Sequence, residues 1–186
     1  AGDKALTDFK VSDSNPCLFM EDGILYGKDH ETLYFLLPSS QKEVLNLTND
    51  VKTIMAYAFW GNDSLKKVQL GSGLYEVPSY AFSNCSNLTD VSIHLPTQSI
   101  GAKAFEDCVS LQYVEVPESV TNIQDTAFDG CPNVKLSAKE GSYAWNYAQN
   151  MQKKTPVEQV EYADVQQAQT VQPQNLTGTN ESQNDS

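Results

Sequence analysis

The sequence predicts a β-rich α/β solenoid of 23-residue coils, with a parallel sheet, one β-hairpin insertion and a C-terminal capping helix. An Ala-Phe pair recurs four times at intervals of 23 residues. Aliphatic residues keep fixed distances before and after each pair, and the segment that follows alternates between apolar and polar residues. A single coil of this length cannot bury its own apolar side, so the coils are expected to stack and cover one another.

The repeating columns define the interior of the predicted solenoid. The pairs are Ala58-Phe59, Ala81-Phe82, Ala104-Phe105 and Ala127-Phe128. An aliphatic residue lies four positions before each Ala, at Ile54, Val77, Ile100 and Ile123. Another lies seven positions after it, at Leu65, Leu88, Leu111 and Val134. We expect the four Phe rings to lie in a row inside the stack.

The segment after each pair predicts a short strand. Val68 and Leu70 would point inward, whereas Lys67 and Gln69 would point outward. Neighbouring coils would pair through these strands into a parallel sheet with strands about 4.8 Å apart. The two outward columns then read Val44, Lys67, Asp90, Tyr113 and Asn46, Gln69, Ser92, Glu115.

An insertion interrupts the repeat near the N-terminus. Leu6, Phe9 and Val11 match a first strand, and the next strand ends at Leu47, 36 residues after Val11. This distance is one period plus 13 residues, which suits a two-stranded insertion over about residues 14–38.

The phase of the repeat also bears on the first residue. Aligning Leu6 with Leu65 puts Ala1 opposite Trp60, inside a coil. We therefore expect a fragment of a longer protein with earlier coils; the alternative is a natural N-terminus without a cap.

The last predicted coil loses its strand pattern after Cys131-Pro132. Ser142 is expected to cap a helix over about residues 142–153 that covers the open end of the core. The apolar face of this helix would carry Ala144, Tyr147, Ala148 and Met151. The repeat domain would thus span residues 1–154, followed at 155–186 by a flexible acidic linker or tail rich in Gln, Asn, Thr and Ser.

The repeat resembles a known family. The pattern I-x-x-x-A-F-x-x-C-x-x-L-x-x-V-x-V, clearest at 77–93 and 100–120, is similar to the BspA-like, treponemal-type leucine-rich repeats. Asn15-Pro16 followed by Asp22-Gly23 fits the hairpin found in that family, and the resemblance covers about residues 1–154. It implies a leucine-rich-repeat solenoid that serves as a non-enzymatic adhesion module of a secreted or cell-surface bacterial protein. The implied partners are host matrix proteins such as fibronectin or fibrinogen, or another bacterial surface protein.

Composition excludes several kinds of partner. The chain carries 12 Lys, no Arg and 24 acidic residues, a formal charge of −12, which argues against nucleic acid and anionic membranes. Its longest apolar runs, such as residues 33–38, are too short for membrane insertion. No signal peptide is visible at the start.

Three of the four cysteines share one phase. Cys85, Cys108 and Cys131 are spaced by 23 residues, and Asn62 takes the same slot in the first full coil, whereas Cys17 lies outside this column. Because Asn takes this position as well as Cys, the position does not need sulfur. We therefore expect buried free thiols that bond or pack the backbone of the turn. A disulfide or a metal site is the alternative reading.

No catalytic, cofactor or metal site is expected. His30 and His94 have no carboxylate or Cys at a triad or ligand spacing, so both are read as solvated loop residues. Paired carboxylates, Asp125 with Asp129 for example, are read as an acidic solvated face.

The outward columns remain as the candidate binding surface, made of Lys67, Gln69, Asp90, Ser92, Tyr113 and Glu115. Tyr113 is the expected anchor, since Tyr is enriched in interface hot spots; otherwise these are ordinary solvated residues. A protein partner and a monomeric chain are expected. Two alternatives stay open: a spacer or targeting module within a larger extracellular enzyme, and a glycan-binding platform that would use Tyr113, Tyr75 and Trp60.

Overall fold

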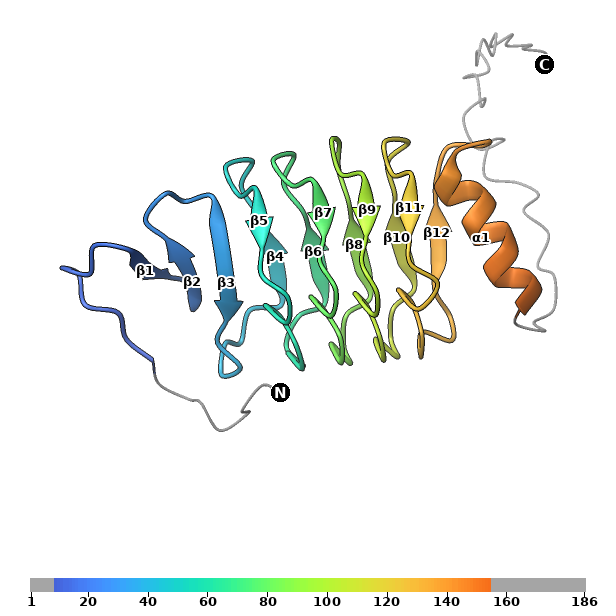
Figure 1. Cartoon of the computed structure of the whole chain (residues 1–186). Helices are drawn as coiled ribbons and strands as arrows, with labels where there is room; N and C mark the ends of the chain where they lie inside the picture. The colour runs from blue at the N-terminus through green and yellow to red at the C-terminus, as the bar shows by residue number, and fades with distance from the viewer. Residues whose placement is uncertain (1–8, 155–186) are drawn as a thin grey trace, which may run out of the picture. The chain divides into compact units, whose positions relative to one another are not determined.

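The computed structural model describes residues 9–154. These residues lie within one compact unit, Ala1–Thr155, in which successive coils stack side by side and a helix closes one end (Figure 1). The predicted linker at 155–186 lies outside the described residues, so the predicted boundary after residue 154 stays a prediction. The predicted solenoid of stacked coils is confirmed.

The outward columns lie on a five-stranded parallel sheet, which we call the front sheet. Its strands are β4 (Val44–Asn46), β6 (Lys67–Gln69), β8 (Asp90–Ser92), β10 (Tyr113–Glu115) and β12 (Lys135–Ser137). The middle residue of each strand points inward, and those of the first four strands are buried. The expected loss of the strand after Cys131-Pro132 is wrong, because Lys135–Ser137 pair in register with β10 and Leu136 lies opposite Val114.

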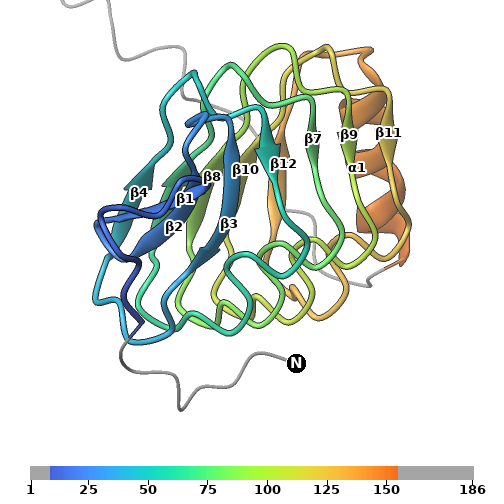
Figure 2. The same cartoon turned by 60° about the vertical axis from the view of Figure 1, so that its left-hand side comes forward.

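A second layer of short strands forms the return limb of the coils (Figure 2). It contains a three-stranded parallel sheet of β7 (Glu76–Val77), β9 (Ser99–Ile100) and β11 (Asn122–Ile123). The aliphatic column before each Ala-Phe pair supplies the buried residue of each strand. The core lies between this layer and the front sheet.

The Phe column forms a continuous stack of rings in the core. Adjacent ring centroids from Phe59 to Phe128 lie 4.6, 5.4 and 5.3 Å apart, and neighbouring planes differ by 5° or less. Phe59, Phe82 and Phe105 are at most 1% exposed. The predicted row is confirmed, and it follows from the coil spacing, because equivalent atoms of paired strands lie about 4.8 Å apart.

The segment that contains the predicted two-stranded insertion forms three strands. They are β1 (Leu18–Glu21), β2 (Ile24–Gly27) and β3 (Thr32–Leu36), each antiparallel to the next. The third strand also pairs in parallel with β5 (Thr53–Ile54), which places Leu33 opposite Ile54. Strand β3 therefore occupies the return-limb position of a coil, and only β1 and β2 project from the repeat.

The predicted first strand at 6–11 is not found in its described part. Phe9–Val11 form no strand, and Leu6 lies outside the described residues. The chain turns immediately afterwards, where the Asn15 amide donates to the Ser12 carbonyl at 2.8 Å. Strand β4 pairs only with β6, so the edge of the front sheet next to β4 has no further strand. Residues Phe9–Val11 therefore do not pair with β4 as a preceding coil would.

Helix α1 (Tyr143–Lys154) lies against β12 and β11 at the end of the stack. Its N-terminus is capped as predicted, since the Trp145 amide donates to Ser142 Oγ at 3.2 Å. Ala144 is fully buried, and Tyr147 and Met151 pack against the core. The helix thereby covers apolar side chains of the last coil.

The phased cysteines are free and buried, which confirms the prediction of buried free thiols. The thiols of Cys85, Cys108 and Cys131 donate to the carbonyls of Phe59, Phe82 and Phe105 at 3.1, 3.1 and 3.0 Å. Asn62 in the same slot accepts from the amides of Ser64 and Leu65 at 3.0 and 2.9 Å. Each residue of the column therefore satisfies backbone groups at a turn.

Candidate binding surface

The predicted site residues lie together on the exposed side of the front sheet. Strand register aligns Lys67, Asp90 and Tyr113 in one row, which Val44 and Lys135 extend. It also aligns the second row, Asn46, Gln69, Ser92, Glu115 and Ser137. We call these two rows the front face. Its backbone is held by strand pairing, so the side chains are presented on a rigid support.

Exposure differs along the rows. Lys67, Gln69 and Glu115 are exposed, whereas Asp90 and Ser92 are half-buried. Tyr113 is 52% exposed, which makes it the largest side chain that the front face offers to solvent. An exposed Tyr on a fixed strand offers a large contact area at a low cost in conformational entropy.

The front face is electrically balanced. Lys67 Nζ lies 3.8 Å from Asp90 Oδ2, and the Thr89 hydroxyl donates to the same oxygen at 2.6 Å. The two lysines of the first row, Lys67 and Lys135, offset the charges of Asp90 and Glu115. The rows thus have no formal net charge, although the whole chain carries −12. An acidic molecule would therefore meet less electrostatic repulsion at this face than the net charge of the whole chain suggests.

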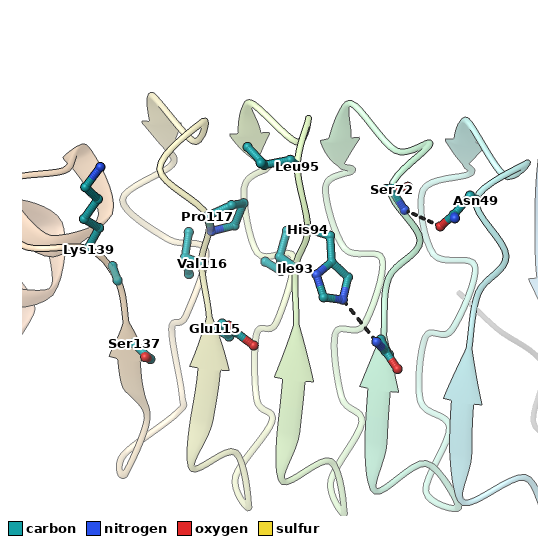
Figure 3. A pocket seen from close by; sticks show the side chains of 12 residues that line it. Asn49, Ser72, Ile93, His94, Leu95, Glu115, Val116, Pro117, Ser137 and Lys139 are labelled. Atoms are coloured by element: carbon teal, nitrogen blue, oxygen red, sulfur yellow. Dashed lines mark hydrogen bonds between the residues drawn. The ribbon is translucent and has the colours of Figure 1, made fainter. Parts of the chain in front are cut away.

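A hollow of about 560 Å³ adjoins the carboxyl ends of the front strands (Figure 3). Gln69, Glu115 and Ser137 of the front face line one side of it. The Gln69 side-chain amide lies 3.3 Å from His94 Nε2, within hydrogen-bonding distance. The interpretation of His94 as a solvated loop residue did not include this contact with Gln69. The sequence contained a signal for it, because His94 lies two residues after the strand Asp90–Ser92, at the end of the front sheet.

The rest of the hollow combines apolar and polar groups. Leu95 is 56% exposed at its edge, and Val116 and Pro117 also line it (Figure 3). Lys139 forms an ion pair with Glu118. Within residues 9–154 no hydrogen bond joins His94 to Glu115, and no group of three or more His, Cys, Asp or Glu side chains suits a metal ion. The arrangement is suited to holding a ligand of mixed polarity.

The aromatic residues named for glycan binding are not brought together. Tyr113 is on β10, Tyr75 comes directly before β7, and Trp60 comes directly after Phe59 in the sequence. Among the described residues no ring contact joins any two of them. A different pair, the exposed Tyr57 and the half-buried Tyr80, stacks with ring centroids 4.8 Å apart and an angle of 13° between the rings. These two tyrosines are 23 residues apart, so the repeat period itself contained the signal for this pair.

A stack of coils joined by parallel sheets, with a continuous Phe column in its core, defines a repeat solenoid. A family model described as the BspA type leucine rich repeat region, in six copies, matches residues 39–135. This match covers just over half of the sequence, and the chain belongs to that family.

Solved structures agree with this assignment. The pneumococcal vaccine antigen PcpA is similar with a TM-score of 0.66 and 26% identity, over 69% of this chain and 32% of that one. A leucine rich cell surface protein from Faecalibacterium prausnitzii is similar with a TM-score of 0.59 and 21% identity, over 71% of this chain and 42% of that one. This chain thus spans less than half of the length of each of these two solved proteins. The search of curated proteins found no match.

Family and fold together identify a repeat module of the kind that serves protein interaction, and such solenoids are typically non-catalytic. Among the described residues, no helix has the length and apolar character needed to cross a membrane.

Proposed function

We propose that this chain is a non-enzymatic adhesion module of a secreted or cell-surface bacterial protein, and that its front face binds a protein partner. The proposed partners are host matrix proteins such as fibronectin or fibrinogen, or another bacterial surface protein. The chain is proposed to act as a monomer. The residues proposed to make the contact are Lys67, Gln69, Asp90, Ser92, Tyr113 and Glu115.

The observation that carries the proposal is the position of Tyr113. Its side chain is 52% exposed in a row in which Asp90 and Lys135 flank it on paired strands. Interface hot spots are enriched in Tyr and are surrounded by polar contacts that exclude water. A half-exposed Tyr with charged neighbours on a rigid sheet matches that arrangement. The adjoining hollow near His94 would accept a side chain of the partner.

Two further facts support the location and the class of partner. One of the similar solved structures is described as a cell surface protein, and the other as a vaccine antigen. The balanced charge of the front face favours a protein surface of mixed polarity over a strongly charged polymer.

The test measures binding of the full chain to immobilised fibronectin, fibrinogen and bacterial surface protein extracts fractionated into single components. We expect Tyr113→Ala to weaken binding at least tenfold, because it removes the proposed anchor. Lys67→Ala should mainly slow association. The matched control is Tyr75→Ala, since Tyr75 is 59% exposed but lies outside the front sheet.

Equal losses for Tyr113→Ala and Tyr75→Ala would overturn the assignment of the front face. Binding to none of these proteins would overturn the adhesion proposal and favour the spacer or targeting module. Binding only to sugars on a glycan array, lost with Tyr113→Ala, would replace the protein partner with a glycan.

A further inference from the structure

A second hollow, of about 970 Å³, lies where the last coil meets helix α1, and we call it the helix groove. Its apolar lining includes Val109, Phe128, Pro132, Tyr143, Tyr147 and Met151. None of these residues lines the hollow beside the front face, so the two sites are separate. Figure 1 shows α1 beside the last strands of the stack.

The groove exists because the Phe column ends without a matching ring. Phe128 stacks on Phe105 with an angle of 4° between the planes. On its other side the neighbour is Tyr147, whose ring is tilted by 55° with the centroid 6.4 Å away. A tilted, more distant ring fills less of the space beside Phe128 than the next coil of the stack would.

Apolar side chains remain exposed at the mouth of the groove. Val109 of the neighbouring coil is 52% exposed, and Tyr143 in the first turn of α1 is 44% exposed. The Tyr147 hydroxyl donates to the Gln124 carbonyl at 3.3 Å, which holds the helix on the last coil. The groove is thus a formed feature with apolar area still available for burial.

The rim of the groove is acidic. Asp125 and Asp129 line it, and no Lys does. The ion pairs formed within residues 9–154 include neither of these carboxylates. Burial and the charges of Asp125 and Asp129 raise the pKa of Tyr147 to about 12, so the field of both carboxylates reaches into the groove.

We propose that the helix groove binds a linear peptide segment of a partner protein in which a Lys or Arg lies next to a large aliphatic or aromatic residue. The apolar side chain packs between Val109, Phe128 and Tyr143, and the cation lies at Asp125 and Asp129. Charge complementarity selects this occupant, because an apolar groove with two carboxylates at its rim disfavours an acidic segment and attracts a basic one. The proposal is independent of the front face.

The experiment starts with selection of random twelve-residue peptides displayed on phage against the immobilised full chain. We expect the enriched peptides to contain Lys or Arg beside Leu, Ile, Phe or Trp. Synthetic copies are then measured by fluorescence anisotropy. Asp125→Asn combined with Asp129→Asn should weaken binding at least tenfold, since it removes both charges and keeps the side-chain shape. Val109→Ser should weaken binding by a similar factor.

Controls separate this proposal from charge in general and from the front face. Asp50→Asn combined with Asp63→Asn removes the same number of charges from exposed turns and should leave the affinity within twofold. Tyr113→Ala should also have no effect. Circular dichroism and urea unfolding establish that each variant is folded.

Three results would overturn the proposal. One is the absence of any enriched peptide, and another is enrichment of peptides that lack a basic residue. The third is binding that persists in both groove variants or is lost with Tyr113→Ala.

Discussion

At the scale of single residues, the repeat gives each position a fixed environment. Phe82 and Phe105, the inner members of the Phe column, each stack on a Phe ring in the coil before and in the coil after. The cysteine column behaves in the same way, since each thiol donates to a carbonyl in the preceding coil. Columns of this kind are visible in the sequence because equivalent positions of successive coils have the same surroundings and therefore carry the same type of residue.

Phe82→Ala should lower the free energy of unfolding by about 3–5 kcal/mol, because it empties a fully buried site between two stacked rings. Urea denaturation measures the change. Tyr113→Ala serves as the exposed control and should change stability by less than about 0.5 kcal/mol. A loss for Phe82→Ala no larger than that of the control would contradict the stacked core.

Thiol reactivity should separate Cys17 from the phased cysteines. Cys17 is exposed, whereas Cys85, Cys108 and Cys131 are buried. Contact with the Cys108 thiol, together with burial, raises the pKa of Cys131, so its reactive thiolate is rare near neutral pH. In native buffer at pH 8, DTNB should modify one thiol rapidly and the others only after unfolding. Cys17→Ser should abolish the fast phase; a remaining fast phase would show that a phased thiol is accessible.

At the scale of elements, regular coils and their interruptions differ in how far the sequence predicts them. The short strand and the capping helix follow from local patterns, and Ser142 makes the predicted cap. The two projecting strands β1 and β2 follow from the 13 extra residues, whereas the pairing of β3 with β5 was not predicted, since it joins segments that share no motif. Strand β12 was missed because Pro132 interrupts the local pattern, whereas pairing with β10 restores it.

Removal of the helix cap should destabilise the end of the stack. Ser142→Ala leaves the Trp145 amide without its side-chain acceptor and should cost about 1 kcal/mol in urea unfolding. Ser142→Asp retains an acceptor oxygen and should keep nearly full stability. Equal losses for both variants would mean that the hydroxyl contributes by packing and not as a cap.

At the scale of the whole molecule, the described part of the chain is a one-dimensional stack. Each coil contacts its immediate neighbours, so stability adds coil by coil and the terminal elements have fewer partners. In the front sheet, β8 has a paired strand on both sides, whereas β4 pairs only with β6. The same linear layout separates the front face from the helix groove and allows two independent interaction sites.

Native-state hydrogen exchange should follow this layout. Backbone amides in β4 should exchange at least tenfold faster than those in β8, because opening an edge strand breaks fewer contacts. Mass spectrometry of overlapping peptides gives the rates. Uniform exchange in both strands would indicate that the stack opens only as one cooperative unit.

The sequence by itself determined the period, the inward columns, the row of Phe rings, the helix cap and the membership of six residues in one exposed sheet face. These features depend on residue types that recur in a fixed phase, and such information is local or periodic. The tertiary structure alone decided the pairing of β3 with β5, the place of β12 and its Lys135 in the front sheet, and the helix groove. Each of these depends on how aperiodic segments meet the stack, and that is set by long-range packing that no repeating column encodes.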